Sequence, residues 1–173
     1  MNKLVKKLML VAAMLMLAAG PSFAADAIRI GLMCPLTGKW ASEGQDMQQI
    51  VSLLVSEVNK AGGINGKQIE LIVEDDAGDP RTASLAAQKL ASAGVMAVIG
   101  TYGSAVTEAS QNIIDEAEIM QIATGSTSVR LTEKGLPLFF RTCPRDDEQG
   151  RVASKVIAAE IRDYLCRWDM QGH

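Results

Sequence analysis

The sequence predicts an α/β fold in which a parallel sheet of about five strands has helices on both faces. Two observations lead to this prediction. Short apolar runs alternate along the chain with longer segments whose apolar residues recur at helical spacing, a pattern typical of parallel βαβ units. The run Val95 to Ile99 is apolar at every position, which indicates a central strand covered on both faces.

The first half of this pattern covers residues 27–73. Apolar residues alternate over 27–33, as expected of a strand. From Ser42 onward they recur at helical spacing as far as Val58. Lys60 in the last turn and Gly62 just beyond it are typical of a helix end. A second strand is expected over 68–73.

The second half opens with a helix that we expect over 80–92. Asp79 suits the N-cap, because its carboxylate can accept hydrogen bonds from the free N–H groups of the first turn, and Pro80 suits the first helical position. The remaining elements are a strand over 95–99, a helix over 104–117, a strand over 119–123 and a fifth strand over 138–142.

The N-terminus has the pattern of a secretory signal peptide. Lys3, Lys6 and Lys7 precede an unbroken apolar run from Leu8 to Ala19, and small residues follow. This run is too short for a membrane anchor, which needs about 20 apolar residues. We therefore expect export to the periplasm or beyond, with cleavage after Ala24 or Ala25 and no membrane insertion of the mature chain.

Composition excludes several classes of function. The formal net charge is −3, and removal of Lys3, Lys6 and Lys7 with the signal peptide makes it −6. An acidic exported protein without a basic run is a poor candidate for binding nucleic acid. The three cysteines allow at most one internal disulfide, and His173 is the only histidine. Zinc sites and histidine-based catalysis are therefore not expected.

Two loops carry the strongest candidate for a binding site. Residues 100–107 and 124–128 follow two apolar strands and are rich in glycine and hydroxyl side chains. Ligands of open parallel sheets bind beyond the carboxyl ends of the strands. Ser104 and Thr107 open a helix whose free N–H groups favour an anion such as a carboxylate. The alternative is that Ser104 serves only as the N-cap, with Thr107 in the first turn.

Two further features have both a functional and a structural interpretation. Trp40, in a loop after the first strand, is placed to cover an apolar ligand group or to pack within its own loop. The acidic residues are either a cation or phosphate-acceptor site or a solvated strand end followed by an N-cap, and we favour the latter. They are Glu74, Asp75, Asp76 and Asp79.

Catalytic machinery is not found in the sequence. The serines lack a histidine partner, and neither a Ser-x-x-Lys motif nor a glycine-rich nucleotide-binding motif occurs. A fold with a ready binding edge and no catalytic residues indicates a binding module that uses no cofactor and no metal.

Five segments together resemble the type I periplasmic binding proteins of branched-chain amino acid ABC transporters, the leucine/isoleucine/valine-binding family. They are IRIGLMCPLTG, GGINGKQIELIVEDDAGDP, VIGTYGSAVT, IATGSTSVRLTEKG and FFRTCPRDDEQG. The resemblance implies a flavodoxin-like first lobe over 27–143, followed by the start of a second lobe over 144–173. It also implies capture of a small, branched-chain or aliphatic amino acid in the periplasm and its delivery to an inner-membrane permease.

The resemblance also implies roles for individual residues. Ser104 and Thr127 correspond to the residues that hold the α-carboxylate of the ligand, and Gly125 and Ser126 to positions whose backbone faces it. In addition, Tyr102 and Trp40 lie where the family lines the cleft. Gly78 and Gly103 stand where some members have a cysteine pair.

The tail departs from the family pattern. Residues after about Ala158 lack the pattern of the second lobe, so we expect a chain truncated or shifted in frame near residues 158–162. Two other functions remain open at this point. They are a ligand-sensing domain for amides, urea or aromatic acids, and a secreted α/β hydrolase.

Overall fold

The computed structural model describes residues 27–170, and the signal peptide expected over residues 1–24 lies outside this range. All neighbouring strands are parallel, and the sheet has the order β2-β1-β3-β4-β5. The strands are β1 Ile28–Cys34, β2 Ile69–Asp75, β3 Ala97–Ile99, β4 Met120–Ala123 and β5 Phe139–Arg141. The helices are α2 Ala41–Lys60, α3 Pro80–Ser92, α4 Ser104–Glu116, α5 Arg130–Glu133 and α6 Asp146–Met170. The predicted α/β class and five-stranded parallel sheet are confirmed.

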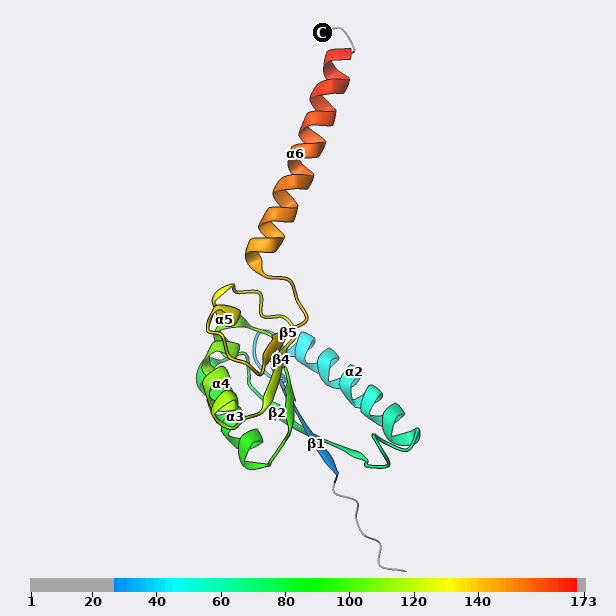
Figure 1. Ribbon diagram of the computed structural model, residues 1–173, viewed down its shortest axis with the longest axis vertical. Helices are drawn as coiled ribbons and strands as arrows, with labels where there is room; N and C mark the ends of the chain where they lie inside the picture. Colours follow the sequence, from blue (N-terminus) through cyan, green and yellow to red (C-terminus); the bar gives the residue numbers. More distant parts are fainter. Residues whose placement is uncertain (1–26, 171–173) are drawn as a thin grey trace, which may run out of the picture.

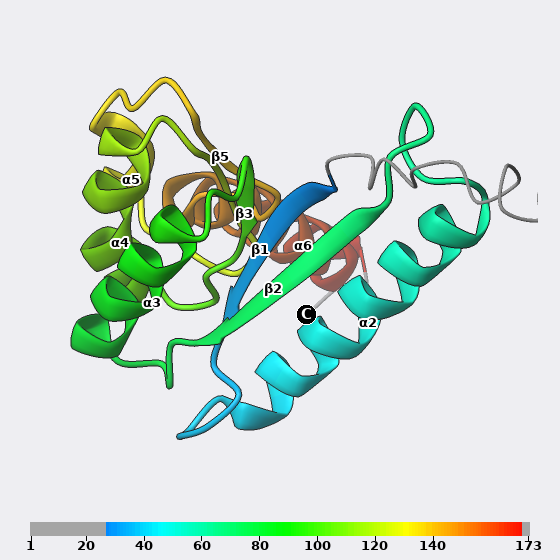
Figure 2. The same cartoon turned by 90° about the horizontal axis from the view of Figure 1, so that it is seen from below.

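The helices lie on both sides of the sheet (Figures 1 and 2), with α2 on one side and α3, α4 and α5 on the other. The start of α3 is the one predicted from the sequence. Asp79 is its N-cap and accepts a hydrogen bond from the backbone N–H of Thr82 at 2.9 Å, and Pro80 is the first helical residue. Local capping chemistry therefore fixes where the chain turns back along the sheet.

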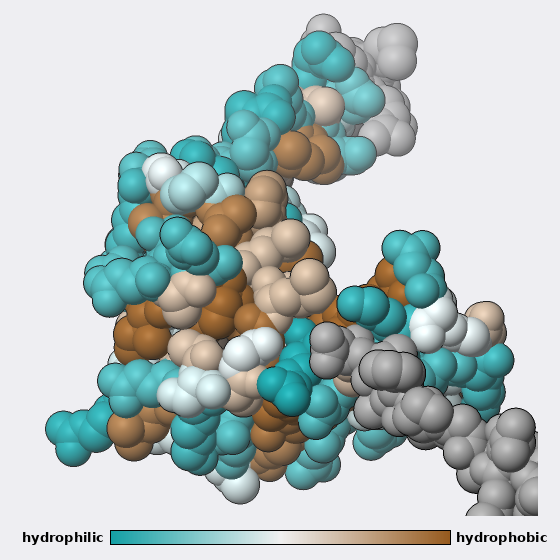
Figure 3. All heavy atoms as spheres, turned by 60° about the horizontal axis from the view of Figure 1, so that its bottom comes forward, coloured by the Kyte–Doolittle hydropathy of each residue, from teal (hydrophilic) through white to brown (hydrophobic). Residues whose placement is uncertain are grey.

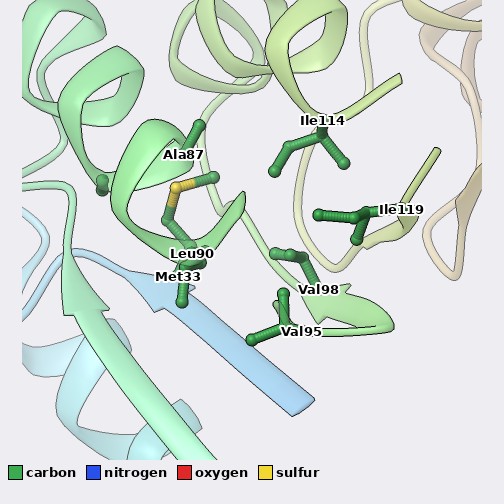
Figure 4. Close-up of a cluster of buried hydrophobic side chains, with 8 residues drawn as sticks. Met33, Ala87, Leu90, Val95, Val98, Ile114 and Ile119 are labelled. Carbon is green, nitrogen blue, oxygen red and sulfur yellow. The ribbon is translucent and has the colours of Figure 1, made fainter. Parts of the chain in front are cut away.

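The sheet face beneath α3 and α4 holds the main hydrophobic core. Residues of neighbouring strands lie side by side there and are all buried: Gly31, Val98, Gln121 and Phe139. Leu90 of α3 and Ile114 of α4 pack with Met33 and Val98 in one cluster (Figure 4). The core thus supports the central strands from one side.

The opposite face is covered only at one end. Ile30, Ala97 and Met120 lie side by side on it. Helix α2 packs mainly on β1 and β2, so Met120 is 38% exposed and Phe140 is 50% exposed. In β3 itself, Val98 is buried under α3 and α4, and Ala97 and Ile99 on the opposite face are half-buried, so the exposure of this face increases toward β4 and β5. Figure 3 shows apolar surface, drawn in brown, between the hydrophilic areas of the body.

Helix α2 is attached to the body at its two ends, by close packing of Gly44 near its start and, in its last turn, by two hydrogen bonds between the Asn59 side chain and the backbone of Ile69. Gly44 is its only buried residue, whereas Ile50 and Leu54 are both 59% exposed although they belong to the predicted apolar stripe. The helix ends at Lys60, and Gly62 and Gly63 then take positive φ angles of 103° and 76°. Glycine adopts this left-handed backbone without steric cost, which explains the predicted stop.

Helix α6 leaves the body on the side where the strands end (Figure 1). The sequence predicts the start of a second lobe over 144–173, without the second-lobe pattern after about Ala158. The structure instead has one helix of 25 residues, Asp146–Met170. No glycine or proline occurs between Arg151 and Met170, so nothing in that stretch interrupts a helix. Within residues 27–170, no helix combines the length and apolarity needed to cross a membrane.

Candidate ligand-binding site

The predicted site residues lie at the carboxyl edge of the sheet, around the ends of β1, β3 and β4. The chain runs from β1 to β2 on one side and places β3 on the other side of β1. Strand order therefore reverses between β1 and β3, which is where ligands bind in open α/β sheets. Three loops meet there, formed by residues 35–40, 100–103 and 124–129.

Ser104 is not the N-cap of α4. Gly103 holds that position with an extended backbone, and no side chain caps the helix. The first-turn N–H groups of α4 therefore keep their capacity to bind an anion. Ser104 is half-buried, and its Oγ accepts a hydrogen bond from the backbone N–H of Ser128 at 3.2 Å. This bond joins the loop after β3 to the loop after β4.

Thr127 lies in the second of these loops, one residue from Ser128. Its carbonyl accepts a hydrogen bond from the backbone N–H of Asp146 at 3.0 Å, so the start of α6 is tied to this loop. Among residues 27–170, neither the hydroxyl nor the backbone N–H of Thr127 has a hydrogen-bond partner. Two donors of a half-buried residue are therefore left for a ligand or water.

An aromatic wall joins all three loops. The rings of Trp40 and Tyr102 pack edge to face, with centroids 5.7 Å apart and an interplanar angle of 70°. The Tyr102 ring also lies against Gly125, where an added Cβ would stand 2.6 Å from Tyr102 Cδ2. Gly125 is thus the residue that lets the aromatic ring approach the loop after β4.

The indole of Trp40 lies between Gly78 and Gly103. A Cβ added to either glycine would meet the indole at 2.8 Å and 2.6 Å respectively. The ring therefore occupies the space between the two positions that are cysteines in some members of the family that the sequence resembles. Lys39 Nζ also lies 3.9 Å from the centroid of the Trp40 ring. Trp40 therefore packs against neighbouring loops as well as its own.

The hydroxyls of Thr107 and Ser126 point into the protein rather than toward the edge. Both side chains are fully buried, and their oxygens are 2.5 Å apart. The Thr107 hydroxyl is therefore not available to an anion at this edge. Thr107 lies one turn further along the same face of α4 as Ser104, and there its hydroxyl meets Thr101 and Ser126 inside the protein.

Two charged residues that sequence reasoning did not select hold the site loops in place. Arg141 Nη1 donates hydrogen bonds to the carbonyls of Ser126 at 3.1 Å and Ser128 at 2.9 Å. Asp75 accepts hydrogen bonds from the backbone N–H of Leu36 at 2.8 Å and from the hydroxyl of Thr37 at 2.6 Å. Asp75 is the last residue of β2 and Arg141 is the last residue of β5. Their positions in the sequence do not indicate which loops they contact.

The sequence profile of the periplasmic binding protein family matches residues 27–163. The chain belongs to this family. The Leu/Ile/Val-binding protein homolog 1 of Brucella abortus is 40% identical over 147 residues, which are 85% of this chain and 39% of the relative. The leucine-, isoleucine-, valine-, threonine- and alanine-binding protein of Pseudomonas aeruginosa is 40% identical over 146 residues, which are 84% of this chain and 39% of the relative.

A solved structure shows the same fold. The branched-chain amino acid transporter substrate-binding protein LivJ of Streptococcus pneumoniae, in complex with isoleucine, superposes with a TM-score of 0.67 at 32% identity. The match covers 70% of this chain and 35% of LivJ. This periplasmic binding protein chain thus spans about two fifths of the length of its curated relatives. These relatives are named as binding proteins rather than enzymes.

The acidic cluster of this periplasmic binding protein is divided among separate structural roles. Asp79 caps α3, and Glu74 pairs with Lys89 at 2.9 Å. Burial acts to raise the pKa of Asp75, but hydrogen bonds from Thr37, Ala77 and Leu36 lower it overall. Asp75 therefore favours its charged form, in which it binds the loop after β1.

Asp76 differs from its neighbours because it is fully buried. Its Oδ1 accepts a hydrogen bond from the backbone N–H of Gly78 at 2.8 Å, whereas Oδ2 has no partner among the described residues. Burial, assisted by the charge of Asp75 and opposed by the Gly78 bond, raises the pKa of Asp76 to about 6. Charging this carboxyl at neutral pH therefore costs folding free energy.

The two cysteines described are free thiols. Cys34 is buried and Cys143 is half-buried. Burial and the charges of Asp76 and Asp75 raise the pKa of Cys34 to about 12. Cys34 is therefore a protonated core residue of the periplasmic binding protein and not a reactive thiolate.

Proposed function

We propose that residues 27–143 form the first ligand-binding lobe of an amino-acid-binding protein, and that residues 144–173 begin a second lobe. This proposal rests on one observation: two sets of hydrogen-bond donors lie in the two loops that the Ser104–Ser128 hydrogen bond joins. One set is the uncapped N-terminus of α4 with the Ser104 hydroxyl, and the other is the hydroxyl and N–H of Thr127. Donors converging from two loops suit the two oxygens of a carboxylate.

The rest of an aliphatic amino acid can be placed from this anchor. From the resemblance, we assign the Gly125 carbonyl as the acceptor for the α-ammonium group and the backbone of Ser126 as facing the ligand. The Trp40 and Tyr102 rings provide apolar surface for the side chain of the ligand. The relatives are named as binding leucine, isoleucine and valine, and these names support a branched-chain ligand.

The biological role proposed is capture of this amino acid in the periplasm and delivery to an inner-membrane ABC permease. Membership of the periplasmic binding protein family supports the location, and the transporter named for the similar LivJ structure supports the partner. Binding requires no chemical step. The first lobe supplies one wall, so the chain alone is expected to bind in the millimolar range, equivalent to about −4 kcal/mol.

The first prediction concerns the carboxylate. L-leucine titrated into the mature chain should shift the amide NMR signals of Ser104 and Thr127, whereas L-leucinol, which lacks the carboxylate, should not. Ser104→Ala and Thr127→Ala should each weaken binding roughly tenfold, because a desolvated carboxylate oxygen loses its donor. Ser52→Ala, on the exposed surface of α2, is the control and should leave affinity unchanged. Unchanged affinity in both site variants would move the site elsewhere.

A second candidate ligand class is favoured by the aromatic wall. The edge-to-face pair of Trp40 and Tyr102 is also suited to stacking against an aromatic carboxylate. In the same titration, benzoate binding more tightly than leucine would assign the lobe to aromatic acids. Tighter binding of leucine would retain the branched-chain assignment.

A further inference from the structure

Three buried hydroxyls join the two site loops from behind. Thr101 lies in the loop after β3, Thr107 one turn into α4, and Ser126 in the loop after β4. All three are 0% exposed. Thr107 Oγ1 is hydrogen-bonded to Thr101 Oγ1 and lies 2.5 Å from Ser126 Oγ. Thr107 is therefore the central member of a chain of hydroxyls.

The hydrogen bonds of this chain can all be satisfied in one direction. Either oxygen of each hydroxyl pair can be the donor, so one consistent arrangement has Thr101 donating to Thr107, Thr107 to Ser126, and Ser126 to the Tyr102 carbonyl at 3.2 Å. The Gly103 carbonyl, 3.2 Å from Thr107 Oγ1, is a second acceptor for the Thr107 hydroxyl. Each hydroxyl has one proton, so each donates once and the chain ends on a backbone acceptor. Removing the middle hydroxyl would interrupt this chain and leave the Thr101 hydroxyl with only the Gly103 carbonyl, at 3.4 Å, as its acceptor.

Each end of the Thr107–Ser126 contact is next to a proposed ligand donor. Ser104 precedes Thr107 by three residues on α4, so the two lie on neighbouring positions of one helix face. Thr127 directly follows Ser126 in the chain. The 2.5 Å contact therefore ties α4 to the loop after β4 at a point between the two donors, in addition to the bond between the two loops from the Thr124 N–H to the Thr101 carbonyl at 3.2 Å.

We propose that Thr107 is a positioning residue that holds Ser104 and Thr127 at the separation needed to bind one carboxylate. The inference rests on the proposed function, because it assigns the support of that same site. Thr107 itself makes no contact with ligand, since its side chain is fully buried.

The test compares two substitutions at this position. Thr107→Val keeps the shape but removes the hydroxyl and should weaken L-leucine binding roughly tenfold. Thr107→Ser keeps the hydroxyl and should bind within about twofold of the natural protein. In addition, the Ser128 amide, whose acceptor is Ser104 Oγ, should exchange its hydrogen faster in Thr107→Val without any ligand present. Thr107→Ser should restore slow exchange.

Ser110→Ala is the matched control for general destabilisation. Ser110 is a buried hydroxyl on the same helix that donates to the Thr107 carbonyl at 3.0 Å and accepts from Gln121 at 3.2 Å, with no direct hydrogen bond to either loop. Its loss should lower the melting temperature without changing leucine affinity or Ser128 exchange.

The outcomes separate this inference from the proposed function. If Ser104→Ala weakens binding and Thr107→Val does not, the positioning role is wrong and the site stands. If Thr107→Val and Ser110→Ala change affinity and exchange equally, Thr107 has only a structural role. If Ser104→Ala has no effect on binding, the proposed function fails, and the exchange of the Ser128 amide still decides whether Thr107 fixes the loops.

Discussion

Replacing Gly44 with alanine is expected to destabilise the fold by about 3 kcal/mol, although alanine normally stabilises a helix interior by about 1 kcal/mol relative to glycine. The added Cβ would lie 2.0 Å from the carbonyl oxygen of Pro35 and 2.4 Å from its carbonyl carbon. Both atoms belong to the backbone, so they cannot rotate away. Steric overlap should therefore outweigh the gain in helix propensity, as measured by urea unfolding of the mature chain.

Gly150 provides the matched control. It lies in α6, and an added Cβ would meet nothing within 4 Å. Gly150→Ala should therefore show helix propensity alone, with stabilisation of α6 of up to about 1 kcal/mol, detectable as increased helical circular dichroism. A Gly44→Ala protein as stable as the natural one would mean that α2 does not approach Pro35 as closely as described. Because Pro35 begins the loop that carries Trp40, that result would also question the position of the aromatic wall.

Asp76→Asn is expected to change how stability depends on pH. The folded-state pKa of Asp76 is raised to about 6, so the folded protein binds a proton more tightly than the unfolded chain. The natural protein should therefore lose stability as pH rises through that value and regain it as pH falls. The stability difference between Asp76→Asn and the natural protein should grow by about 2 kcal/mol between pH 4 and pH 8. Any constant cost of the buried amide cancels in this pH comparison.

The measurement is urea unfolding at intervals from pH 4 to pH 8. Asp79→Asn is the control with the opposite sign, because hydrogen bonds from Thr82 lower the pKa of Asp79. The stability that Asp79 contributes should be lost as pH falls, and asparagine should retain the cap itself. Parallel pH profiles for Asp76→Asn and the natural protein would show that Asp76 is not charged at a cost in the folded state.

Local sequence signals were sufficient for most of the fold. Asp79 and Pro80 marked the start of α3 because capping depends on a few neighbouring residues. The order of the strands and of α2, α3 and α4 followed from hydrophobic periodicity, whereas the four-residue helix α5 was not predicted. The edge that gathers Ser104, Thr127 and Trp40 followed from the rule that parallel strands end on one side.

Other features depend on contacts between distant parts of the chain. Thr107 carries the same hydroxyl whether it faces a ligand or the interior, and only the position of Ser126 decides which. Ile50 and Leu54 have the spacing of a buried stripe, but burial requires a second surface that the sheet does not provide along all of α2. The role of Arg141 likewise depends on two carbonyl groups of another loop, to which its guanidinium donates.

The helices cover the two faces of the sheet unequally, and this affects where the chain tolerates amino-acid substitutions. Val98 and Gln121 are enclosed beneath α3 and α4, while their strand neighbours Ala97 and Met120 face the side that α2 leaves partly open. Tolerance to substitution should therefore alternate from one residue to the next along β3 and β4. Tolerated substitutions would then fall at every second residue of these strands, on the side of the sheet that lacks a full second layer.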